Sequence, residues 1–168
     1  VGRTQLSFVI ALLLAVPTLF FQPLAIDGGE SRFLLHSWAF GAVLYASTIA
    51  YLLRHVFQRD VMTADKLYGA AAAYLMLGVL WGYLYAIANH LQPGSFAFGG
   101  TVAAPLLGDL LYFSLTTLTS TGFGDAVPLL RYARGLCVLE QLVGALFLAI
   151  LIARLAGVYP PGRENAGT

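Results

Sequence analysis

Long apolar segments dominate this chain and restrict what it can fold into. Four of them, at about residues 6–26, 33–57, 67–91 and 133–158, are long enough to cross a bilayer as helices, which takes ~20 residues. Hydrophobic residues make up 59% of the 168 residues and charged residues only 10%, too few for the surface of a soluble domain. We therefore expect an all-α membrane protein, because helices satisfy their own backbone hydrogen bonds in lipid.

The first apolar segment allows two interpretations. As a spanning helix it would be kinked at Pro17. As a signal peptide it would follow Arg3 and be cleaved near residues 23–25. We favour the span, which gives four transmembrane helices in one chain.

The basic residues predict the orientation, because cytoplasmic loops are enriched in Lys and Arg. With both termini in the cytoplasm, six of the nine basic residues lie inside and three lie outside. We expect a multi-pass protein of the cell (plasma or inner) membrane, with residues 91–134 on its outer side. The net charge of +1 and the lack of a basic run predict no nucleic-acid partner. The inner group is Arg3, Arg54, Arg59, Lys66, Arg154 and Arg163, and the outer group is Arg32, Arg131 and Arg134.

A fifth apolar piece, residues 105–118, is too short to cross the membrane and fits a re-entrant helix or an interfacial segment. It ends in a run of hydroxyl residues and is followed by Gly122-Phe123-Gly124-Asp125. A glycine-rich backbone at membrane depth must be buried in protein or line water, because its polar groups would otherwise lack partners. The hydroxyl residues are Thr116, Thr117, Thr119, Ser120 and Thr121.

The two glycines predict what this loop can do. Glycine permits positive φ, so successive carbonyl groups can point the same way. Repeated around a symmetry axis, such carbonyls form stacked oxygen rings that can replace the hydration shell of a cation. The hydroxyl of Ser120 would add an inner ring, and the Phe123 side chain would point away from the axis. The carboxyl end of the re-entrant helix would place its negative dipole toward the cation.

The stretch 110–144 resembles the pore of potassium channels, whose filter usually reads T-V-G-Y-G-D. Here the six positions are Ser120-Thr121-Gly122-Phe123-Gly124-Asp125. The resemblance implies a homotetramer that conducts K⁺ passively, in which K⁺ is the permeant ion and no cofactor takes part. It also implies that residues 66–159 form the pore domain, after two extra N-terminal helices (1–65) and before a short cytoplasmic tail (160–168). Beyond this, the first two helices resemble only prokaryotic channels of the same general class.

The family also implies roles for single residues. Backbone carbonyls of Ser120, Thr121, Gly122 and Phe123 would bind K⁺, with the Gly124 carbonyl as a weaker outer ligand. Asp125 would stand at the outer mouth, Tyr112 would brace the filter, and Thr116 and Thr119 would support it. Thr116 stands where several family members carry an acidic partner for the aspartate, and Gly144 stands where many carry a hinge glycine of the inner helix.

Three positions depart from the usual filter: Ser120 replaces threonine, Thr121 replaces valine and Phe123 replaces tyrosine. These changes leave a weakly selective monovalent cation channel as an alternative on the same fold. A transporter subunit or an intramembrane enzyme is more remote. The spans show no metal-ligand cluster or nucleophile–base pair and no inverted repeat. We therefore expect no enzyme.

Three further positions in the spans remain open. Glu140 is an acidic residue inside the fourth span, where charges are costly. It would either hydrogen-bond the Thr/Ser cluster behind the filter, which we favour, or face the conduction cavity and attract cations. Gly144 would serve as a hinge or simply allow packing. Gly78 and Gly82 either mark close helix packing or reflect the general abundance of small residues in membrane helices.

Overall fold

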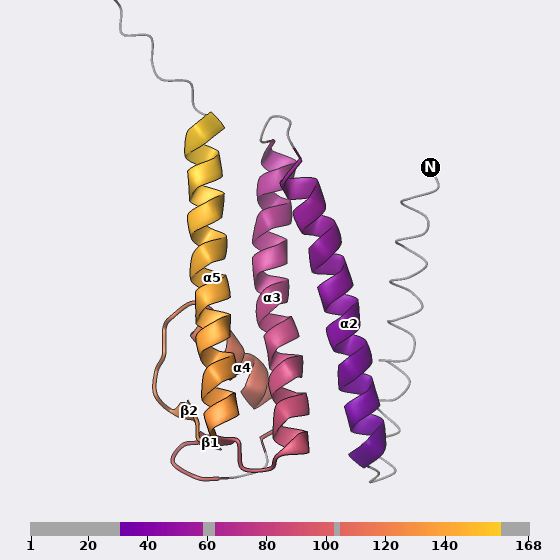
Figure 1. Ribbon diagram of the computed structural model, residues 1–168, viewed down its shortest axis with the longest axis vertical. Helices are drawn as coiled ribbons and strands as arrows, with labels where there is room; N and C mark the ends of the chain where they lie inside the picture. The colour runs from indigo at the N-terminus through magenta and orange to yellow at the C-terminus, as the bar shows by residue number, and fades with distance from the viewer. Residues whose placement is uncertain (1–30, 59–62, 103–104, 159–168) are drawn as a thin grey trace, which may run out of the picture.

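The computed structural model describes residues 31–58, 63–102 and 105–158. In chain order it contains α2 (Ser31–Val56), α3 (Ala64–Leu91), β1 (Phe96–Phe98), α4 (Leu107–Leu118), β2 (Ala126–Pro128) and α5 (Arg131–Val158) (Figure 1). The spans predicted at 33–57, 67–91 and 133–158 correspond to α2, α3 and α5. The span predicted at 6–26 and the tail at 160–168 lie outside the described residues.

Three helices in the described part of the chain, α2, α3 and α5, are long and apolar enough to cross a membrane. The prediction of a multi-pass, mainly helical membrane protein is confirmed to this extent. Many apolar side chains of α5 are exposed in the single chain, including Leu142, Leu146 and Ile152. Such an apolar surface needs contact with lipid or with another protein chain.

The helix α3 lies between the other elements: α2 packs on one side of it, and α4 and α5 pack on the other (Figure 1). Its first turn is capped by the Thr63 side chain, which accepts a hydrogen bond from the Lys66 N–H at 3.4 Å. On the α2 side, the rings of Tyr45 and Tyr83 lie 5.7 Å apart. A Cβ at Gly41 would come within 2.9 Å of the Tyr83 ring, so α2 and α3 approach closely there.

The contact between α3 and α4 depends on Gly78 and Gly82. A Cβ at Gly78 would come within 2.5 Å of the Leu115 side chain, and a Cβ at Gly82 within 2.5 Å of Leu111. The two glycines therefore let the short helix nest against α3. Of the two interpretations of this pair, close helix packing is the one that the structure shows.

An aromatic cluster closes the lower part of the bundle. The rings of Tyr85, Phe96 and Phe113 are buried, with centroids 5.2–5.3 Å apart. Phe96 belongs to β1, which pairs antiparallel with β2 so that Phe96 faces Pro128. This two-stranded sheet is an addition to the expected all-α fold, and it joins the segment before α4 to the segment after the glycine-rich loop.

Candidate functional site

The short helix α4 enters the bundle from one end and the chain returns to that same end. It starts after Pro105, and the Asp109 Oδ2 atom accepts a hydrogen bond from the Leu106 N–H at 2.9 Å. After 12 residues it ends at Leu118, alongside α5, and the loop 119–125 leads back to β2 (Figure 1). The helix is too short to cross a membrane, so its path is that of a re-entrant helix.

The backbone of the loop alternates in conformation. Residues Ser120, Gly122 and Gly124 have φ values of +56°, +56° and +82°. Ser120 is the one non-glycine residue with positive φ in the described part of the chain. A backbone in which φ alternates in sign can turn successive carbonyls to the same side.

The N–H groups at the start of the loop are directed back to α4. The Ser120 N–H donates to the Thr117 carbonyl at 3.0 Å, and the Thr121 N–H donates to the Thr116 carbonyl at 2.9 Å. The Gly122 N–H also points to the Thr116 carbonyl, at 3.3 Å. Thr116 therefore supports the loop through its main chain. Among the residues that the structure describes, no hydrogen bond uses the carbonyls of residues 119–124.

Side chains around the loop support it from within the same chain. The Thr119 and Thr121 hydroxyls lie 2.8 Å apart, which gives the Thr121 hydroxyl its partner. The Tyr112 hydroxyl donates to the Asp125 carboxylate at 2.9 Å, and the Tyr112 ring stacks on Phe123 with centroids 6.3 Å apart. The hydrogen bond to Asp125 raises the pKa of Tyr112, because ionisation would place a phenolate beside a carboxylate.

Behind the loop, Glu140 is buried between three helices. Its Oε1 atom lies 2.5 Å from the Ser114 Oγ atom of α4, and its Oε2 atom accepts a hydrogen bond from the Tyr85 hydroxyl of α3. The Ser114 Oγ atom also lies 2.7 Å from the Gly78 carbonyl. The partners of Glu140 are thus Ser114 and Tyr85, and not the Thr/Ser cluster 116–121 suggested by the sequence.

Gly144 lies one turn further along α5 and touches the end of α4. A Cβ at Gly144 would come within 2.5 Å of the Leu118 carbonyl oxygen. The same carbonyl accepts a hydrogen bond from the Tyr74 hydroxyl at 3.1 Å. Close packing is therefore one reason for glycine at this position, and α5 continues as a helix through it. A hinge at Gly144 stays a prediction.

The profile of a protein family described as "Ion channel" matches residues 72–159, which is just over half of the chain. The chain belongs to this ion-channel family. The family is that of potassium-channel pore domains, so the resemblance seen in the sequence is confirmed, and the protein is a channel and not an enzyme. Searches of curated proteins and of solved structures find no match.

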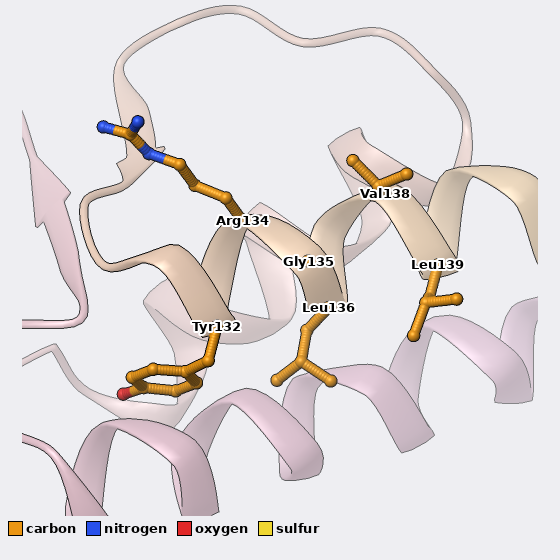
Figure 2. Close-up of a pocket in the computed structure, with 6 residues that line it drawn as sticks. All are labelled: Tyr132, Arg134, Gly135, Leu136, Val138 and Leu139. Carbon is orange, nitrogen blue, oxygen red and sulfur yellow. The ribbon is translucent and has the colours of Figure 1, made fainter.

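In this ion channel the first turns of α5 line a hollow beside the loop (Figure 2). Tyr132 and Leu136 point toward α3, whereas Arg134 and Val138 point to the other side of α5. The Arg134 Nε–H donates to the Pro128 carbonyl at 3.3 Å and so ties α5 to the end of β2. The lining residues are Tyr132, Arg134, Gly135, Leu136, Val138 and Leu139.

Sequence reasoning missed several residues that support the channel's loop. Ser114 and Tyr85 are both fully buried beside Glu140, yet a serine in an apolar helix and a tyrosine near other aromatics gave no distinct signal. Tyr74 was missed for the same reason. One signal did exist: a carboxyl group in a spanning helix requires buried polar partners, and Ser114 lies on the neighbouring short helix.

Proposed function

We propose that this ion channel is a potassium-selective homotetramer whose filter is residues 120–124. The observation that carries the proposal is the alternation of φ at Ser120, Gly122 and Gly124, directly after a re-entrant helix in a channel pore domain. Carbonyls of Ser120 to Phe123, with the Ser120 hydroxyl and the Gly124 carbonyl at the two ends, would replace the water around K⁺. Several ions would then pass in single file.

A ring of four chains is supported by what one chain leaves exposed. Residues 119–125 are all exposed in the single chain, and Phe123 is 69% exposed. One chain supplies one filter strand, and carbonyls surround an ion only when several strands share an axis. The apolar surface of α5 and the hollow at its start offer the matching surfaces for neighbouring subunits.

Electrostatics favour a cation at both ends of the filter. The carboxyl end of α4 carries the negative end of the helix dipole and lies at the inner end of the loop. Asp125 stands at the outer end, where its charge would concentrate cations and where Tyr112 holds it in place. In this channel Tyr112 supplies a partner for Asp125, whose expected acidic partner is replaced by Thr116.

The proposed topology puts the Val56 end of α2 and the Val158 end of α5 in the cytoplasm of the cell membrane. Arg54 and His55 lie in the last turn of α2. Arg154 of α5 donates a hydrogen bond to the Gln58 carbonyl and lies 5.3 Å over the Phe57 ring, so basic residues gather at one end of the bundle. Residues 66–159 would form the pore domain, and the helices before it would form a collar that faces lipid.

A flux assay tests this proposal. Purified protein in liposomes should pass K⁺ and Rb⁺ without any other substrate gradient, and should pass little Na⁺ or Li⁺. Equal flux of K⁺ and Na⁺ would instead show a weakly selective cation channel. Flux that requires a second substrate gradient would show a transporter. The subunit number, measured by crosslinking and by light scattering in detergent, should be four.

A further inference from the structure

Glu140 is a carboxyl group that ion conduction as proposed does not use. Its side chain is 0% exposed, and it lies within α5 among apolar neighbours. In the part of the chain that the structure describes, no ion pair involves it. A buried carboxylate without a cationic partner is costly, so its hydrogen bonds must explain its presence.

Counting protons assigns the charge of Glu140. Three close contacts link the group: Ser114 Oγ to Gly78 O at 2.7 Å, Ser114 Oγ to Glu140 Oε1 at 2.5 Å, and the Tyr85 hydroxyl to Glu140 Oε2. The two hydroxyl groups supply one hydrogen each, and Gly78 O is only an acceptor. With one hydrogen assigned to each contact, the third belongs to Glu140, and the carboxyl group is neutral in this arrangement. It donates to Ser114, which donates to Gly78 O, while Tyr85 donates to Oε2.

The position of this chain of bonds connects it to the filter. Ser114 and Leu118 are one turn apart on α4, and Glu140 and Gly144 are one turn apart on α5. Glu140 meets Ser114, and Gly144 meets Leu118, so α5 holds α4 at two successive turns. Leu118 is followed directly by the loop 119–125, so a shift of α4 would shift the filter carbonyls.

We propose that Glu140, as a neutral acid, is a positioning residue that couples the inner helix α5 to the pore helix α4 and thereby keeps the filter selective. The proposal rests on the proposed function. Glu140 touches no permeant ion in this scheme. It acts through Ser114, and the group that matters is a hydrogen-bond donor and not a negative charge.

The test compares Glu140→Gln, Glu140→Leu and Ser114→Ala in the full-length channel in liposomes, with the K⁺-to-Na⁺ flux ratio as the readout. Glutamine can donate to Ser114 and accept from Tyr85, so E140Q should keep the ratio within about twofold of wild type. E140L and S114A each break the chain of bonds and should lower the ratio about tenfold. Gln141→Leu is the matched control, because Gln141 is the exposed next residue of α5 and its replacement should leave the ratio unchanged.

Three results would overturn the proposal. E140Q as damaged as E140L would show that the charge matters, and E140L or S114A with the wild-type ratio would show that the bonds do not position the filter. Loss of tetramers in both E140L and S114A would show a role in assembly alone and would also overturn it. Absence of K⁺ flux in the wild type would be a failure of the proposed function, distinct from all of these.

Discussion

The loop 119–125 and the contact behind it differ in how much of each is complete within one chain. Residues 119–125 are exposed, and an added Cβ at Gly122 or Gly124 would meet nothing within 4 Å. The rear contact, which we define as Tyr85, Ser114, Leu118, Glu140 and Gly144, is buried and bonded across α3, α4 and α5. One chain therefore builds its own support, whereas under the proposed function the conducting surface would require neighbouring chains.

The largest effect should follow from a change in the loop itself. Gly122→Ala places a Cβ at φ +56°, which costs an L-residue about 1–2 kcal/mol in each strand of the proposed tetramer. The new Cβ meets no atom in the single chain, so the penalty comes from the backbone conformation and not from a clash. We expect the loop carbonyls of the variant to lose their common direction. We expect K⁺ flux to fall to that of empty liposomes.

The matched control for Gly122→Ala is Gly69→Ala in α3. A Cβ there would lie at an ordinary 3.4 Å from the Val56 side chain, far from the loop. Normal flux in G122A would show that the alternating backbone has no role in conduction, and the loop would then not be the conducting surface. Loss of flux in both variants would point to folding instead.

A smaller effect is expected in the rear contact at Gly144. In Gly144→Ala the new Cβ would lie 2.5 Å from the Leu118 carbonyl oxygen, so α5 must move away from α4. Overpacking of this kind costs about 1–3 kcal/mol. We expect the tetramer to dissociate at a lower temperature and the K⁺-to-Na⁺ flux ratio to fall, while part of the flux remains.

Gly69→Ala is again the control, because its Cβ would lie at an ordinary 3.4 Å from the Val56 side chain and away from the hollow on α5. If G144A matches G69A in both dissociation temperature and flux ratio, the rear contact does not restrain the filter. A hinge role of Gly144 would show differently, as a lower open probability with an unchanged flux ratio in single-channel recordings.

The comparison also explains what the sequence could predict. Spanning helices depend on length and apolarity alone, so α2, α3 and α5 were predictable to within a few residues. The loop was recognisable because Gly122-Phe123-Gly124-Asp125 is a local pattern. The rear contact was not, because Tyr85 and Glu140 are 55 residues apart and meet only after three helices pack. The β1–β2 pairing was missed because its strands have three residues each.

The hydrogen bond between Tyr112 and Asp125 at the outer end of the loop should matter less than the contact at Gly144, but more than the packing at Gly41. Tyr112→Phe keeps the stacking on Phe123 but removes the hydrogen bond to Asp125, worth about 1 kcal/mol. We expect conduction to begin normally and then decline faster during sustained recording, because the outer mouth is less restrained. Tyr68→Phe is the control, since Tyr68 is a 74% exposed tyrosine on α3. Equal decline in Y112F and wild type would show that Asp125 needs no partner from its own chain.

The smallest effect on conduction should come from the α2 side of α3. A Cβ at Gly41 would press on the end of the Tyr83 ring at 2.9 Å, and a side chain can turn aside more easily than a backbone. Gly41→Ala should therefore lower the dissociation temperature of the tetramer slightly and leave the flux ratio at the wild-type value. A changed flux ratio in G41A would mean that α2 acts on the filter through α3. In that case α2 would belong to the structure that supports the loop, together with the rear contact.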